Sequence, residues 1–275
     1  MSRQKNTFME LFYRKLGSGV PMVIVHGLYG VSDNWLSTAK ALAVNFEVYL
    51  IDQRNHGRSP HRGQHTYENM RDDLLGFLKD MGLDSAVLMG HSMGGKTIMC
   101  FAQHHPERVR SLIVVDIAPK SYKDAGRKEP LSHYGIMRAM KEVDFSVAKS
   151  RRDVDRMLGQ TIKQERIRRF LMKNLRQEEG KKYSWALNLD VLMRELDNIM
   201  DGVNEKCFDP AFPVTGIPVL FIRGADSRYI LDEDMDFIQG IFPFAELETI
   251  PGAGHWVHAE QPEAFVNAVT KFVLG

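Results

Sequence analysis

The stretch Gly-His-Ser-Met-Gly at residues 90–94 decides the fold of this chain. It fits the pattern G-x-S-x-G; an apolar run at 86–89 precedes it and a helix-length segment at 95–105 follows it. A serine between a strand and a helix must lie on a sharp turn, and the flanking glycines remove the Cβ atoms that would clash there. The pattern predicts that the Ser92 hydroxyl is exposed as a nucleophile, and that the Met93 amide at the helix N-terminus faces a developing anion.

The composition indicates a soluble globular protein with one large domain, or one domain that carries an insertion. A length of 275 residues with 44% hydrophobic residues provides a sizeable core, and a net charge of +1 gives no global field for nucleic acid or anionic membranes. The first ten residues contain no apolar run typical of a signal peptide, and no apolar run approaches the length of a membrane span. We therefore expect a cytoplasmic protein; its oligomeric state cannot be predicted.

Cys100 and Cys207 do not form a disulfide framework and are expected to be reduced thiols.

Short apolar runs alternate with helix-length segments along most of the chain. Runs such as 22–25 and 112–115 are apolar throughout, as expected of strands covered on both faces by helices. This rhythm predicts a mostly parallel sheet in a three-layer α/β sandwich. Strands are expected at 11–15, 22–26, 48–52, 86–90, 112–116, 219–223 and 246–250, and helices at 35–43, 67–81, 94–104, 232–241 and 262–273.

Residues 119–213 break this rhythm, because no buried strand is evident there. We expect a helical lid inserted between the sixth and seventh core strands, over the carboxyl ends of the strands, with residues 1–118 and 214–275 forming the core. The segment 120–210 carries 20 Lys and Arg against 15 Asp and Glu, which favours a solvated helical surface over a funnel for acidic substrates. Its amphipathic helices are expected at 134–143, 147–158, 165–175 and 186–200.

A serine nucleophile needs a base and amide donors for an oxyanion. His255 is the best candidate for the base, since it follows the last expected strand in a loop containing glycines; His258 is the nearby competitor. Leu28 and Met93 are the expected oxyanion donors, because a glycine after the strand at 22–26 lets the Leu28 amide turn into the site. His26 is expected to brace this loop rather than to react.

The acid that orients the base has two candidates. Asp116 and Asp226 both lie at carboxyl ends of expected strands, where catalytic groups of open α/β sheets gather, and both preserve the chain order Ser, Asp, His. Asp52 also ends a strand, but it precedes the serine and is expected to be a buried carboxylate bonded to its own loop.

No cofactor, metal ion or nucleic acid is expected as a partner. The histidines at 104–105 and at 56, 61 and 65 lack matching ligands at metal-site spacing, and the sequence contains no G-x-G-x-x-G motif or P-loop lysine motif. The expected partner is a small-molecule acyl ester.

Five motifs together carry a resemblance to a known family. They are His-Gly-Leu at 26–28, Asp-Gln-Arg-Asn-His-Gly-Arg-Ser at 52–59, Gly-His-Ser-Met-Gly-Gly-Lys at 90–96, Val-Asp-Ile-Ala-Pro at 115–119 and Gly-His-Trp-Val-His at 254–258. With them the chain resembles the α/β-hydrolase superfamily over nearly its whole length. More closely it is similar to bacterial esterases of the YbfF type and the related ABHD11 group.

The resemblance implies an α/β-hydrolase fold and hydrolysis of acyl esters with broad tolerance for the acyl group, including thioesters in some relatives. We expect a serine carboxylesterase that acts on esters with short to medium acyl chains. The resemblance favours Asp116 as the acid, because the bacterial relatives use the acid after the earlier strand. An assignment carried over from the eukaryotic group would name Asp190 instead, but that residue falls within a helical segment of the expected lid.

Two other functions are compatible with the same residues. One is a C–C bond hydrolase or a cofactor-free lyase of the menaquinone-pathway type, which an arginine-lined pocket would favour. The other is a hydrolase-fold ligand receptor with little turnover. The fold alone does not decide between these and an esterase.

Overall fold

A seven-stranded sheet forms the centre of the computed structural model, which describes residues 9–123, 132–178, 182–202, 207 and 212–275. The strand order is β1-β3-β2-β4-β5-β8-β9, and every pairing is parallel except that of β1 with β3. The mostly parallel sheet expected from the sequence is confirmed. Its strands are β1 (Tyr13–Leu16), β2 (Val20–Val25), β3 (Phe46–Ile51), β4 (Ala86–His91), β5 (Val109–Val115), β8 (Val219–Gly224) and β9 (Ala245–Ile250).

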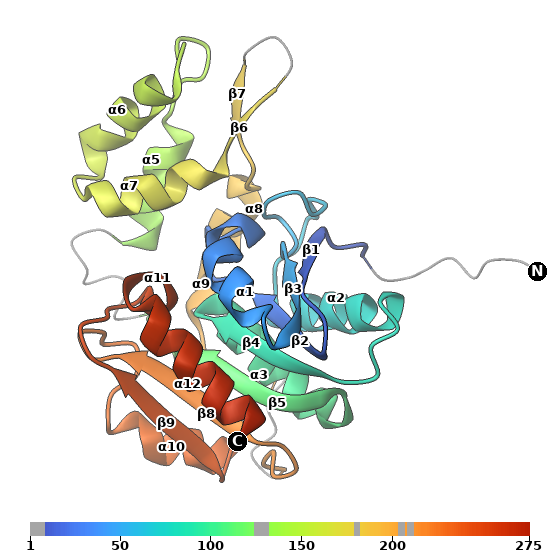
Figure 1. Ribbon diagram of the computed structural model, residues 1–275. Coiled ribbons are helices and arrows are strands. Elements are labelled where there is room, and N and C mark those ends of the chain that lie inside the picture. The colour runs from blue at the N-terminus through green and yellow to red at the C-terminus, as the bar shows by residue number, and fades with distance from the viewer. Residues whose placement is uncertain (1–8, 124–131, 179–181, 203–206, 208–211) are drawn as a thin grey trace, which may run out of the picture.

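Helices cover both faces of this sheet (Figure 1). Because side chains alternate along a strand, Val23 of β2 joins one apolar cluster with Phe77, while Ile24 joins another with Leu42. This two-sided burial explains why the central strands are apolar throughout. One face carries α2 (Tyr67–Asp80), α3 (Met93–His104) and α10 (Asp234–Ile241), and the other carries α1 (Leu36–Leu42) and α12 (Pro262–Leu274).

The start of α2 shows how the sequence sets a helix boundary. Thr66 precedes the helix in an extended conformation, and its side chain accepts a hydrogen bond from the Asn69 amide at 3.3 Å. Met70, Leu74 and Phe77 follow at helical spacing and are buried; Leu74 and Phe77 share a cluster with the strands, and Met70 joins the cluster that contains Leu28 and Tyr29. The remaining short helical elements of the core are η1 (Ser32–Trp35), η2 (Pro106–Arg108) and α11 (Val257–Glu260).

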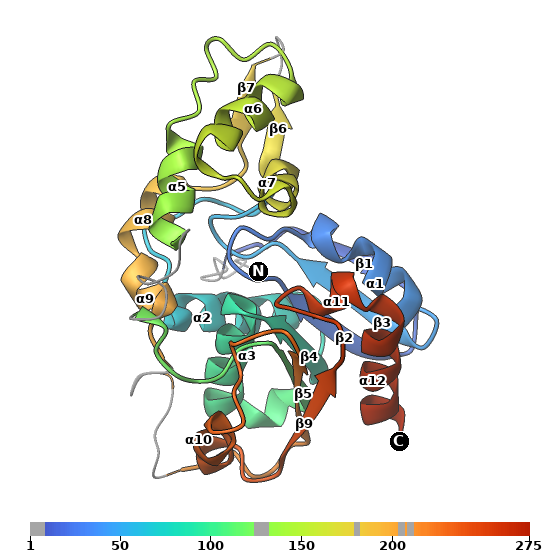
Figure 2. The same ribbon diagram turned by 90° about the vertical axis from the view of Figure 1, so that its left-hand side faces the viewer.

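The elements between β5 and β8 form a helical insertion that stands over one edge of the sheet (Figures 1 and 2). Its apolar side chains share a third cluster with Leu28, Tyr29 and Met93 of the core. The insertion consists of α5 (His133–Lys141), α6 (Arg151–Thr161), α7 (Glu165–Leu171), η3 (Met172–Asn174), β6 (Leu175–Gln177), β7 (Tyr183–Trp185), α8 (Leu189–Arg194) and α9 (Leu196–Met200).

The insertion differs from its sequence-based expectation in three respects. It lies between β5 and β8, the fifth and sixth strands of the seven-stranded sheet in chain order, and not between the sixth and seventh; the seven expected strand ranges also place residues 119–213 after the fifth. It contains the hairpin β6–β7, which the sequence did not indicate because Leu175 alone in β6 is buried. The helix expected at 186–200 is divided into α8 and α9 at Glu195.

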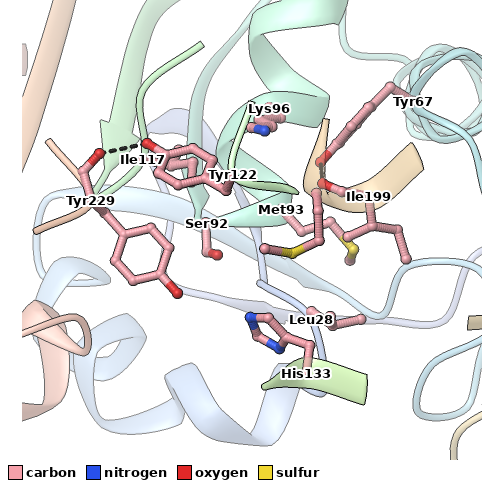
Figure 3. A pocket seen from close by; sticks show the side chains of 11 residues that line it. Leu28, Tyr67, Ser92, Met93, Lys96, Ile117, Tyr122, His133, Ile199 and Tyr229 are labelled. Atoms are coloured by element: carbon pink, nitrogen blue, oxygen red, sulfur yellow. Dashed lines mark hydrogen bonds between the residues drawn. The ribbon is translucent and has the colours of Figure 1, made fainter. Parts of the chain in front are cut away.

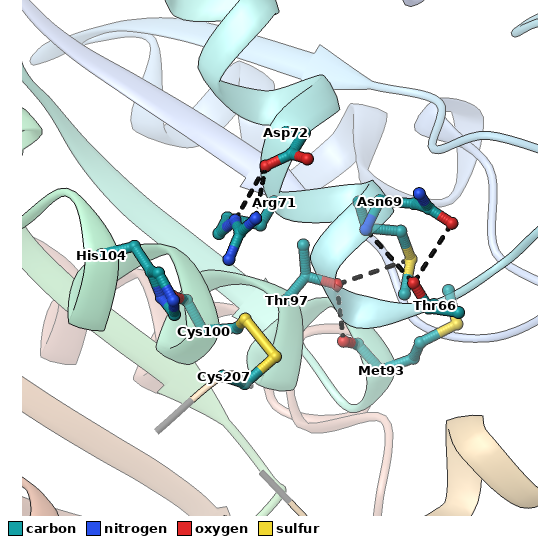
Figure 4. Close-up of a disulfide and its surroundings, with 10 residues drawn as sticks. Thr66, Asn69, Arg71, Asp72, Met93, Thr97, Cys100, His104 and Cys207 are labelled. Carbon is teal, nitrogen blue, oxygen red and sulfur yellow. Dashed lines mark hydrogen bonds and ion pairs between the residues drawn. A yellow bond between two sulfur atoms is a disulfide. The ribbon is translucent and has the colours of Figure 1, made fainter. Parts of the chain in front are cut away.

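The expectation of two reduced thiols is wrong for this structure, because Cys100 and Cys207 form a disulfide (Figure 4). Cys100 lies in α3, and Cys207 follows α9, so the bond connects the helix that follows Ser92 to the end of the insertion. The two residues are 107 positions apart, and only the tertiary packing of the insertion on α3 brings them together. Within the described ranges, no helix is both long and apolar enough to cross a lipid bilayer.

Candidate active site

Ser92 lies on a sharp turn between β4 and α3. Its φ of 52° and ψ of −119° are unusual for a residue with a side chain, and such strain is typical of functional sites. The flanking glycines make this turn possible: a Cβ at Gly90 would collide with the backbone of Gly94, and one at Gly94 would collide with the Val25 carbonyl. Met93 is the first residue of α3, so its amide belongs to the unpaired donors of the helix N-terminus.

Asp116 and His255 are brought together at the same edge of the sheet. The Asp116 carboxylate, fully buried at the end of β5, places Oδ2 2.7 Å from His255 Nδ1. Asp116 also has a positive φ, of 50°, which turns its side chain out of the strand direction. His255 lies in the loop that follows β9 and lines the same cavity as Ser92.

The other acidic candidates lie elsewhere. Asp226 is exposed, and its backbone amide donates to the Ala253 carbonyl at 2.9 Å. Asp190 lies in α8 of the insertion, where its exposed carboxylate pairs with Lys141 at 2.5 Å. Geometry therefore distinguishes Asp116 from both alternatives, because Asp116 alone of the three carries a carboxylate oxygen within hydrogen-bond distance of His255 in the described contacts.

Sequence reasoning missed a role for Ser227. Its hydroxyl donates to Asp116 Oδ2 at 2.5 Å, and the Gly224 amide approaches Asp116 Oδ1 at 3.3 Å. Gly224 is the last residue of β8, the sheet neighbour of β5, and Ser227 lies in the turn that follows it. The signal available in the sequence was the serine beside the second candidate acid, directly after an expected strand.

The loop around His255 is held by several groups. Glu260 accepts hydrogen bonds from the Gly254 amide at 2.9 Å and from the Trp256 amide at 3.1 Å. His91 Nε2 donates to the His255 carbonyl at 2.8 Å, and the Tyr229 ring stacks on the His255 ring with centroids 4.0 Å apart. These contacts fix both the backbone and the ring plane of the candidate base.

His258, the competitor for the base, has a packing role. Its ring stacks on Trp35 with centroids 3.7 Å apart and is buried. Burial, together with the neighbouring His255, lowers the pKa of His258 to about 3, so this ring is neutral near pH 7.

The loop after β2 carries the expected oxyanion donor Leu28. His26 braces it as expected: His26 Nε2 accepts from the Gln53 amide at 3.0 Å, and Gln53 Nε2 donates to the His26 carbonyl at 2.7 Å. Tyr29, with a φ of 62°, connects the loop to the insertion, because Asn174 Nδ2 donates to the Tyr29 carbonyl at 2.7 Å.

Asp52 holds its own loop, as expected. Its carboxylate accepts hydrogen bonds from the Ser32 amide at 2.6 Å and from the Arg58 amide at 2.8 Å. Both Asp52 carboxylate oxygens thus accept hydrogen bonds from backbone amides of the core, and neither oxygen contacts His255 in the described contacts.

A cavity of about 220 Å³, which we call the large compartment, opens beside Ser92 and His255. Apolar side chains of the insertion form much of its wall, namely Ile136 of α5 and Ile167 and Phe170 of α7. A small compartment of about 20 Å³ continues on the other side of Ser92 toward α3 (Figure 3). The two compartments share Leu28, Ser92, His133 and Tyr229 in their walls.

The large compartment has no Lys, Arg, Asp or Glu among the described residues of its wall. Lys96 lines the small compartment, but its ammonium is buried and donates to the carbonyls of Lys120, at 2.9 Å, and Asp201. Burial lowers the pKa of Lys96 to about 7. On the outer surface, Arg166 pairs with Glu260, so this cation also has a partner.

The described part of the chain contains no group of three His, Cys, Asp or Glu residues that could hold a metal ion.

Comparisons with known proteins agree with this architecture. The family model for the alpha/beta hydrolase fold matches residues 20–262. The sn-1-specific diacylglycerol lipase ABHD11 of Mus musculus is 40% identical over 259 residues, covering 92% of this chain and 80% of the relative. Esterase YbfF of Escherichia coli is 34% identical over 253 residues, covering 92% of each chain. The solved structure of a marine microorganism esterase has 46% identity and a TM-score of 0.91, covering 96% of this chain and 99% of that one.

Proposed function

This chain belongs to the alpha/beta hydrolase fold family, and from that premise we propose that it is a serine esterase acting on carboxylic esters with short to medium acyl chains. The 2.7 Å contact between His255 Nδ1 and Asp116 Oδ2, beside the strained turn of Ser92, is the observation that carries the proposal. The named relatives are an esterase and a diacylglycerol lipase, which supports hydrolysis of carboxylic esters as the reaction class.

The proposed reaction is a two-step acyl transfer. His255 carries a proton on Nδ1 toward Asp116, so Nε2 is available to take the proton of the Ser92 hydroxyl as its oxygen attacks the ester carbonyl. The amides of Leu28 and Met93 stabilise the oxyanion of the tetrahedral intermediate. His255 then protonates the leaving alcohol, and water attacks the acyl-enzyme in the same way to release the acid and restore Ser92.

The apolar wall of the large compartment supports an ester with a hydrocarbon acyl chain. Ile136, Ile167 and Phe170 offer a surface that removes such a chain from water. We propose that residues 119–213 act as the lid that forms this wall, and that thioesters of similar acyl groups also fit.

Among the described residues, the compartment walls offer no free cation, which disfavours the C–C hydrolase and lyase alternative because its carboxylate substrates need one. The Lys96 ammonium donates its described hydrogen bonds to the backbone carbonyls of Lys120 and Asp201. The described residues that line the large compartment include no Lys, Arg, Asp or Glu. The ligand-receptor alternative predicts tight binding with turnover far below one per minute.

The cytoplasmic location stays a prediction, and it conflicts with the Cys100–Cys207 disulfide because such bonds are typical of oxidising compartments.

The test is hydrolysis of p-nitrophenyl esters from acetate to palmitate by wild type and Ser92→Ala in parallel. We expect activity that is highest with short or medium chains, and a loss of roughly 10⁴-fold or more in kcat for the variant. A folded protein that labels with a fluorophosphonate but hydrolyses none of these esters would contradict the proposed substrate class.

A further inference from the structure

Helix α7 of the insertion packs on the loop that carries His255. The Phe170 and Trp256 rings lie with their centroids 5.4 Å apart and their planes tilted by 52°. The Arg166 guanidinium lies 4.5 Å from the centroid of the Trp256 ring and also forms an ion pair with Glu260. Because Trp256 follows His255 in the chain, this contact joins the insertion to the immediate neighbour of the candidate base.

The carboxylate of Glu260 is shared between the base loop and the insertion. Oε2 accepts from the Gly254 amide at 2.9 Å, and Oε1 accepts from the Trp256 amide at 3.1 Å and from the Arg166 guanidinium. The two amides flank His255 on both sides. Partial burial acts to raise the pKa of Glu260, but Arg166 and the two amides hold this pKa below its usual value, so the group is a carboxylate near pH 7.

The contact lies where the large compartment reaches the surface. Ile167 and Phe170 line the compartment from α7, and His255 and Trp256 line it from the base loop. All four side chains keep partial exposure to solvent, whereas Leu28 at the inner wall is buried. A shift of α7 would therefore change both the wall of the compartment and the position of the candidate base.

We propose that Arg166 is a positioning residue, which acts from the insertion on His255 through the carboxylate of Glu260. The Trp256 ring keeps the guanidinium in place over the loop. The base is then held most precisely when α7 is packed on its loop, so the insertion contributes to the rate of the chemical step as well as to the cavity wall. This inference rests on the esterase function proposed above and names a further residue of the same site.

The first test separates kcat from KM with p-nitrophenyl acetate, whose acyl group makes little use of the apolar wall. Arg166→Met should lower kcat about tenfold and leave KM almost unchanged, because it misplaces the base without removing a contact with the ester. Arg166→Lys keeps the positive charge and should restore part of kcat. Arg169→Met is the matched control and should match wild type, since Arg169 pairs with Glu165 within α7 at 2.6 Å.

The second test asks whether Arg166 acts through Glu260. The double variant Arg166→Met/Glu260→Gln should be no slower than Glu260→Gln alone, because both changes break the same connection. Wild type offers an independent measurement: the side chains of Arg166 and Glu260 are 54% and 20% exposed, so dissolved salt can screen their pair. Raising NaCl to about 1 M should lower kcat in wild type and have little effect in Arg166→Met.

An unchanged kcat in Arg166→Met, or a change in KM alone, would overturn the inference. Independent, additive losses in the double variant or the same salt response in Arg166→Met and wild type would also contradict it. Failure of the esterase function gives a different result, in which hydrolysis of p-nitrophenyl acetate is absent in wild type or survives Ser92→Ala.

Discussion

The carboxyl edge of the sheet and the helical insertion form one cavity, yet they are built in different ways. The edge supplies Ser92 and Asp116, each directly after a strand and each with a positive φ that the surrounding sheet enforces. The insertion supplies Ile136 and Phe170 from regular helices. Under the function proposed above, this difference would mean that backbone geometry at the sheet edge sets the reacting groups, whereas side chains of the insertion set which substrates fit.

Two connections fasten the insertion to α3, the helix that follows Ser92. Lys96 of α3 donates to the carbonyls of Lys120 and Asp201, which precede and follow the described helices of the insertion. One turn further along α3, Cys100 is bonded to Cys207. The two regions are thus mechanically connected although they have separate roles.

The largest effect is expected from breaking the sheet edge at its acid. Asp116→Asn should lower kcat for p-nitrophenyl butyrate by about 10⁴-fold, because the amide holds the His255 ring in the wrong tautomer. Asp226→Asn is the matched control and should stay near wild type, since that carboxylate is exposed. A large loss in Asp226→Asn with an active Asp116→Asn would reverse the assignment.

Breaking the connection between the two regions should have the next largest effect, on stability. Reduction of Cys100–Cys207 is expected to lower the free energy of unfolding by about 2–4 kcal/mol, because it frees a loop that spans the whole insertion. Urea unfolding with and without dithiothreitol measures this difference. In Cys207→Ser the reductant should change nothing, and identical midpoints for oxidised and reduced wild type would refute the expectation.

Altering the insertion alone should change substrate choice without removing the chemistry. Ile136→Trp narrows the large compartment, so kcat/KM for p-nitrophenyl octanoate should fall about tenfold relative to that for the acetate. Tyr134→Trp, on the exposed side of the same helix, serves as the control. An equal loss on both esters would mean that the insertion does not select chain length.

The smallest effect concerns the pH dependence of the core. The pKa of His258 is about 3 in the folded protein and near 6.5 in the unfolded chain, so the unfolded state binds more protons in this window. Stability should fall as pH drops from 6.5 toward 3, by up to about 1.4 kcal/mol per pH unit for this group. The urea midpoint should fall less steeply between pH 7, 6 and 5 in His258→Phe than in wild type. The same slope of midpoint against pH in both proteins would contradict this prediction.

The sheet edge was predictable from the sequence because its signals are local. Apolar runs located the strands; Ser92 and Asp116 directly follow β4 and β5, and His255 lies in the loop after β9. The residues alone left both Asp116 and Asp226 as candidates, since β5 and β8 are neighbours and both place an aspartate at the same edge, and the resemblance to the bacterial esterases favoured Asp116. The contact of Asp116 with His255 accompanies a positive φ at Asp116, and this turn of the backbone has no sequence signature.

The features of the insertion were less predictable, because they depend on packing between distant segments. The bond between Cys100 and Cys207 spans 107 residues. His133 follows no expected strand and belongs to no motif; it lines the cavity from α5, which is capped by Ser132 and contacted by the Tyr29 hydroxyl. Helical periodicity predicted most of the helices of the insertion but not which of their residues face the serine.

Labelling with a fluorophosphonate probe, followed by peptide mass spectrometry, tests the central claim most directly. The claim is that the sheet edge makes Ser92 a nucleophile. The expected result is one probe group per chain, located on the peptide that contains Ser92, with slow labelling in Asp116→Asn and none in Ser92→Ala. Labelling on another residue, or no labelling of the folded wild-type protein, would contradict it.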